Sequence, residues 1–158
     1  MNAAHAAIKT RRSFKRRHAS ETNLVFMRTF FRSLGAALAG YALIVIVTSV
    51  GFPLVLGHAL VRKDDPREVL LGTLVAVIAG IAGGWLAILI GVLRPIVNAA
   101  LVTIPIAIET TLVLALRTPR DELLFDAVGA LVLIASTLLP GIVQEMRSRR
   151  YRAEPGAA

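Results

Sequence analysis

Glu109 is the one acidic residue deep inside a long apolar stretch of this sequence, and it offers the clearest chemistry. Residues 96–108 and 110–116, on either side of it, carry no charge. Placing a carboxylate at the centre of a membrane costs about 2.5–3.5 kcal/mol or more, and such residues commonly mark transport paths, proton relays or ligand sites. Glu109 is therefore a candidate protonatable site.

Asn98 and Pro105 share a helical stripe with Glu109, and the three form our candidate proton or ligand site. At about 100° per residue, Asn98 and Glu109 differ in direction by only about 20°. Pro105 leaves a backbone carbonyl without its usual partner, and such carbonyls can hold an ion in a broken helix. The alternative is a structural, protonated carboxyl that forms hydrogen bonds across a helix interface with Thr48, Ser49, Ser136 or Thr137.

Signatures of catalysis are missing from the sequence. There is no cysteine, so thiolate catalysis and cysteine-bound metals are excluded. We also find no nucleophile–base pair, no cluster of metal ligands and no phosphate-binding loop. We therefore predict that the protein is not an enzyme and that it has no cofactor or metal.

Four apolar stretches, at residues 34–56, 69–93, 96–116 and 123–143, account for most of the chain. Each has the roughly 20 residues that a helix needs to cross a bilayer. Hydrophobic residues make up 56% of the sequence and charged residues 18%, against about 25% charged in soluble domains. We predict an all-α integral membrane protein, a four-transmembrane-helix antiparallel bundle occupying residues 34–143.

The charges that flank these stretches are distributed unequally. Thirteen of the 18 Lys and Arg residues lie in residues 1–33, at Arg94 or in residues 144–158. The five others lie in the first and third connections, together with five acidic residues. Cytoplasmic segments of membrane proteins carry the excess of Lys and Arg. We predict a multi-pass protein of the cell (inner or plasma) membrane with both termini in the cytoplasm.

The two ends of the chain are strongly basic. We predict a disordered tail at residues 1–19, a short juxtamembrane amphipathic helix at 20–33 that lies in the membrane interface, and a basic tail at 144–158. The net charge of +8 then suits a bilayer surface rather than nucleic acid, which we do not expect as a partner. The residues expected to contact anionic phospholipid headgroups are Arg11, Arg12, Lys15, Arg16, Arg17, Arg147, Arg149 and Arg150.

The second apolar stretch is rich in small residues at intervals of four. In lipid, small residues let helix backbones approach closely, so a face made of them indicates helix–helix contact. Eight such positions fall within a sector of about 140°. They are Gly72, Ala76, Gly80 and Gly84 in one row and Ala79, Gly83, Ala87 and Gly91 in the other.

Three functions remain open on this basis. The first is a non-enzymatic accessory or assembly partner of a larger membrane complex, which packs through its small-residue faces against other subunits or copies of itself. The second is a small oligomeric transporter or channel that uses Glu109 as a protonatable site. The third is a holin-like pore former, which the basic tails suit but which needs no ordered polar stripe.

Overall fold

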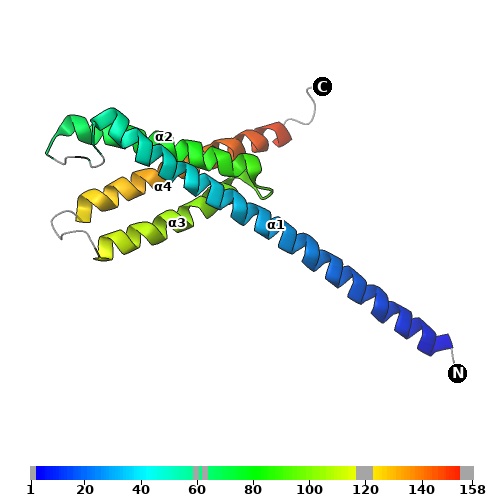
Figure 1. Ribbon diagram of the computed structural model, residues 1–158. Coiled ribbons are helices and arrows are strands. Elements are labelled where there is room, and N and C mark those ends of the chain that lie inside the picture. Colours follow the sequence, from blue (N-terminus) through cyan, green and yellow to red (C-terminus); the bar gives the residue numbers. More distant parts are fainter. Residues whose placement is uncertain (1–2, 59–60, 62–63, 117–122, 154–158) are drawn as a thin grey trace.

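The computed structural model describes the backbone of residues 3–58, 61, 64–116 and 123–153, and side chains within those ranges from Met27 to Tyr151 (Figure 1). This part of the chain is all-helical, with α1 (Ala3–Leu56), α2 (Pro66–Ile90), α3 (Pro95–Leu116) and α4 (Leu123–Ala153). Each helix contains a segment long and apolar enough to cross a membrane: Met27–Leu56, Pro66–Ile90, Pro95–Leu116 and Leu123–Tyr151. Four such segments are typical of a multi-pass membrane protein.

Local capping places α2 about three residues earlier than the apolar stretch suggests. Asp65 is the N-cap, and its carboxylate accepts a hydrogen bond of 2.9 Å from the backbone N–H of Arg67. Pro66 occupies the first helical position, where its missing N–H costs nothing. At the other end, the extended backbone of Gly91 stops the helix, so α2 covers residues 66–90 instead of 69–93.

The N-terminal region differs from the prediction. We expected a disordered tail at residues 1–19 and a separate helix at 20–33, but α1 runs without a break from Ala3 to Leu56. The physical reason is the absence of helix-breaking residues, because the first glycine is Gly35 and the first proline Pro53, while Ala, Lys and Arg are strong helix formers. The basic residues 144–153 likewise continue α4.

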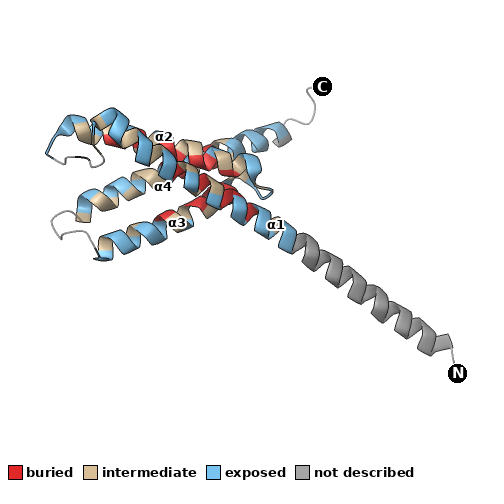
Figure 2. Cartoon of the chain, in the orientation of Figure 1, coloured by how far each residue is buried: buried red, intermediate tan, exposed pale blue. Residues whose placement is uncertain are grey.

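The helices do not pack in the order of the sequence. α2 lies between α1 and α4 and contacts both extensively, and α4 also packs along α3. The contacts of α3 with α1 and with α2 are fewer, and the described parts of α1 and α4 have no Cα atoms within 8 Å of each other. Figure 2 shows the buried residues gathered where the helices cross, toward the end at which residues 91–94 join α2 to α3. We call this part the closed half.

Glycines set the distances between the helices of the closed half. Gly40 of α1 and Gly83 of α2 face each other so closely that a Cβ on either would lie 2.6 Å from the carbonyl oxygen of the other. A Cβ on Gly84 would collide with the backbone carbonyl of Thr137 in α4. A Cβ on Gly141 of α4 would lie 3.0–3.1 Å from the start of α3. Close backbone approach of this kind is what small residues provide in membrane helices.

The eight small residues of α2 therefore divide between two neighbouring helices. Gly80 and Gly84 lie against Ser136 and Thr137 of α4, whereas Gly83 lies against α1. Ala79 and Ala87 are buried in the core cluster, Gly72 is buried near Val61, and Ala76 and Gly91 are half-buried. Bulky residues on the other side of the helix, including Leu70, Leu74 and Trp85, are exposed.

Candidate functional site

A cavity of about 470 Å³ lies between the four helices, in the half of the molecule away from the α2–α3 connection. We call this part the open half. Its lining runs along α1 from Tyr41 to Phe52, along α2 from Val69 to Ala76, along α3 from Ile106 to Leu114 and along α4 from Phe125 to Leu133. Most of the lining is apolar. The polar side chains in it are Tyr41, Thr48, Ser49, Thr73, Glu109, Thr110 and Asp126.

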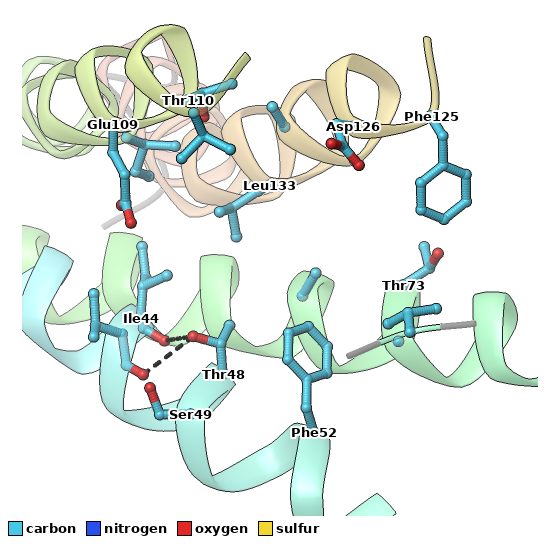
Figure 3. Close-up of a pocket in the computed structure, with 18 of the residues that line it drawn as sticks. Ile44, Thr48, Ser49, Phe52, Thr73, Glu109, Thr110, Phe125, Asp126 and Leu133 are labelled. Atoms are coloured by element: carbon cyan, nitrogen blue, oxygen red, sulfur yellow. Dashed lines mark hydrogen bonds between the residues drawn. The ribbon is translucent and has the colours of Figure 1, made fainter. Parts of the chain in front are cut away.

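Glu109 projects from α3 into this cavity. Figure 3 shows its carboxylate in the space that separates α3 and α4 from α1 and α2. The hydroxyl of Tyr41 on α1 donates a hydrogen bond to Glu109 Oε2, with 2.5 Å between the oxygens. A carboxylate can accept about four hydrogen bonds, so this bond leaves Glu109 with capacity for a ligand.

The alternative hypothesis, a structural carboxyl, predicted hydrogen bonds between Glu109 and four hydroxyl residues on other helices. Three of these predicted partners are wrong. Thr48 donates to the backbone oxygens of residues 44 and 45 at 2.9 and 3.1 Å. Ser136 and Thr137 both donate to the Leu133 oxygen, at 2.9 and 2.7 Å. These hydroxyls satisfy themselves within their own helices, as Ser and Thr commonly do, and the fourth candidate, Ser49, lines the cavity.

Asn98 does not lie with Glu109. Its side-chain N–H donates to Leu93 O at 3.0 Å, beside the α2–α3 connection, and the residue is buried against Gly91. Its Oδ1 has no hydrogen-bond partner in the described part of the chain. The two residues share a direction on α3, but eleven positions separate them by about 16 Å along the helix axis. The buried side chains of Val102 and Ile106 lie between them on α3. Pro105 is half-buried and does not line the cavity either.

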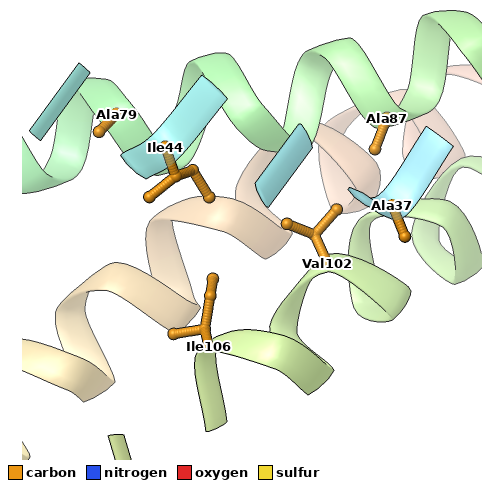
Figure 4. Packing of buried hydrophobic residues seen from close by; sticks show 6 residues of the cluster. All are labelled: Ala37, Ile44, Ala79, Ala87, Val102 and Ile106. Atoms are coloured by element: carbon orange, nitrogen blue, oxygen red, sulfur yellow. The ribbon is translucent and has the colours of Figure 1, made fainter. Parts of the chain in front are cut away.

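The core of the closed half forms the floor of the cavity. Figure 4 shows the buried cluster of Ala37, Ile44, Ala79, Ala87, Val102 and Ile106. Ile44 and Ile106 belong both to this cluster and to the cavity lining. Arg32 also ties α1 to α2 at the far end of the closed half, because its Nε donates to Ile90 O at 3.2 Å. The cavity is thus closed toward the α2–α3 connection.

Sequence reasoning missed four polar residues of the cavity lining, Tyr41, Thr73, Thr110 and Asp126. Tyr41 carries the hydrogen bond to Glu109, yet its position in the first apolar stretch suggests a different depth in the membrane. The close crossing at the neighbouring Gly40 brings that segment of α1 into the bundle, and a single sequence gives no signal for such a contact. Asp126, in the first turn of α4, also lines the cavity.

The predicted lipid contacts whose side chains the structure describes lie away from this cavity. Arg147, Arg149 and Arg150 are exposed on the last turns of α4, and Arg149 Nε is 3.7 Å from Glu145 Oε1. The other predicted side chains lie outside the described residues. They are Arg11, Arg12, Lys15, Arg16 and Arg17.

Comparison with protein families, with curated proteins and with solved structures finds no match for this chain. Within the described residues, no three His, Asp or Glu side chains are grouped to hold a metal ion. The chemistry of the site therefore has to be derived from its own geometry.

Proposed function

We propose that this protein is a small membrane transporter or channel whose ligand binds beside Glu109. The observation that supports this function is the cavity between all four helices, with a carboxylate inside it that a tyrosine from another helix orients. Ligand pockets commonly enclose about 300–1,000 Å³ with a few convergent polar groups, and this cavity has that size and character.

The proposal includes an orientation. Thirteen basic residues flank the spans on one side and five on the other, so the positive-inside rule favours cytoplasmic termini and a cytoplasmic Arg94. The four spans then form an antiparallel bundle in the cell membrane. In this arrangement the closed half faces the cytoplasm and the cavity opens to the outside. The N-terminal part of α1 continues from the span on the cytoplasmic side, where its basic residues meet anionic lipid.

The accessory-subunit hypothesis has less support. It was based on the small-residue faces of the second span, but those faces pack against α1 and α4 of the same chain. A partner subunit would need another surface, and the residues opposite are bulky ones that suit lipid. The holin-like hypothesis gives no reason for a tyrosine–glutamate pair in a cavity.

Charge movement in proteoliposomes tests the proposed function. Rapid jumps in solute concentration would be applied on a solid-supported membrane, with a panel of inorganic cations, organic cations, anions and neutral solutes and with proton gradients. We expect at least one solute or the proton to give a transient current that Glu109→Gln abolishes. Glu145→Gln is the matched control, because it removes a carboxylate near the end of α4, outside the cavity. Absence of any Glu109-dependent current across the panel would rule the function out.

A further inference from the structure

The charge of the cavity lining indicates the sign of its ligand. Glu109 and Asp126 both contribute carboxyl groups to the lining, and no Lys, Arg or His belongs to its described residues. Beside a mostly apolar lining the effective dielectric constant is lower than in bulk solvent, so opposite charges attract each other more strongly there,. A cation is therefore favoured and an anion is excluded by repulsion.

The remainder of the lining indicates what kind of cation fits. Hard inorganic cations such as Ca²⁺ and Mg²⁺ need six or more oxygen ligands, but much of this surface is aliphatic or aromatic. Two of its hydroxyl groups, those of Thr48 and Thr73, already donate to backbone carbonyls of their own helices. The described lining sets two carboxyl groups among mostly apolar side chains, so an organic cation would find more matching surface here than a hard inorganic ion.

Aromatic side chains lie at both ends of the cavity. Tyr41 is hydrogen-bonded to Glu109, while Phe52 and Phe125 line the cavity near the C-terminal end of α1 and the N-terminal end of α4. Aromatic faces attract organic cations, and this attraction strengthens where water is excluded. An apolar body with a single positive charge would match both the aromatic surface and the carboxylate.

We propose that the cavity binds a lipophilic organic cation, with the charge of the ligand at Glu109 and its apolar groups against Phe52, Phe125 and the aliphatic lining. This assignment rests on the proposed function and names the substrate class of the same site. Asp126 lies in the first turn of α4, farther from the buried core than Glu109, and its carboxylate attracts the cation on entry. Glu109, at the greater depth, holds the cation, while the Tyr41 hydroxyl keeps the carboxylate oriented.

The test compares two probes of the same shape and opposite charge. Binding of tetraphenylphosphonium and of tetraphenylborate to the purified protein in detergent would be measured by equilibrium dialysis. We expect saturable binding of the phosphonium only. Glu109→Gln should weaken it about 10- to 100-fold, because it removes the negative charge that attracts the phosphonium in surroundings less polar than water. Asp126→Asn should weaken it by about fivefold or less, and Glu145→Gln should leave it unchanged.

Two further comparisons keep the outcome decisive. Glu109→Asp retains the charge but withdraws it by one methylene, so its affinity should lie between those of the wild type and Glu109→Gln. The comparison of phosphonium with borate on the wild-type protein needs no variant and holds even if a variant fails to fold. Equal binding of both probes, or wild-type affinity in Glu109→Gln, would overturn the cation assignment. A Glu109-dependent current with an anion or a neutral solute would then leave the proposed function standing.

Discussion

The closed and open halves of this molecule are built from the same four helices, yet they are packed in opposite ways. In the closed half, Gly40, Gly83 and Gly84 bring backbones into contact, and the space between helices contains only small or medium side chains. In the open half, α1 and α2 carry Phe52 and Thr73 at the facing surfaces, and a cavity remains between the helices. The difference shows how side-chain size along a helix determines where a bundle is solid and where it is hollow.

Hydroxyl groups in both halves bond within their own helices, but a hydrogen bond between two side chains of different helices lies in the open half. The hydroxyls of Ser136 and Thr137 in the closed half are satisfied within α4 and make no bond to a neighbouring helix. In the open half, Tyr41 of α1 and Glu109 of α3 are hydrogen-bonded to each other. A polar pair that joins helices can be opened by a ligand that competes for the carboxylate, whereas a hydroxyl bonded to its own backbone is inert. The open half is therefore where binding can change the arrangement of the helices.

The largest effect is expected from adding bulk to the closed half. In Gly84→Leu the new side chain would collide with the Thr137 backbone, which cannot move without displacing α4. Over-packing commonly costs about 1–3 kcal/mol and sometimes more, and we expect about 3 kcal/mol or more here. Thermal unfolding in detergent, followed by the fluorescence of Trp85, would measure it.

Gly35→Leu is the control for this experiment. Gly35 is exposed and no atom lies within 4 Å of the Cβ that a larger residue would add, so the same substitution should leave the unfolding temperature almost unchanged. If Gly84→Leu and Gly35→Leu unfold alike, the close approach of α2 and α4 is not what stabilises the bundle.

The second prediction applies the same change to the open half. Gly129 of α4 lines the cavity, is exposed and has no atom within 4 Å of its Cβ position. Gly129→Leu should therefore alter stability by only about 0.5 kcal/mol, but it should fill part of the cavity. Binding of tetraphenylphosphonium should weaken about tenfold, as expected for an obstructed apolar pocket. Unchanged binding at unchanged stability would show that the ligand does not occupy this cavity.

The sequence predicts the closed half better than the open half. Apolar length identifies all four candidate spans, and the small residues of α2 are recognisable from their spacing. The site is harder to predict, because the Tyr41–Glu109 contact depends on how α1 crosses the bundle at Gly40. Asn98 illustrates the limit: it shares a helical direction with Glu109 but lies in the closed half, since direction around a helix says nothing about what fills the distance along it.

The smallest effects compare single hydroxyl groups in the two halves. Tyr41→Phe removes a hydrogen bond between helices, which is worth about 0.6 kcal/mol on average within membranes and at most about 1.7. Thr137→Val removes a hydroxyl that bonds only within α4, where Leu133 O can keep its regular helical partner,. We expect a change of less than about 0.5 kcal/mol for Thr137→Val.

Reversible unfolding in mixed detergent and denaturant would measure both changes, and phosphonium binding would separate their functional effects. Tyr41→Phe should also weaken binding, because the Glu109 carboxylate loses the donor that orients it, whereas Thr137→Val should bind like the wild type. A larger loss of stability in Thr137→Val than in Tyr41→Phe would reverse the comparison. It would mean that hydroxyl groups stabilise the closed half together with its glycines. It would also mean that the Tyr41–Glu109 hydrogen bond contributes little to the stability of the open half.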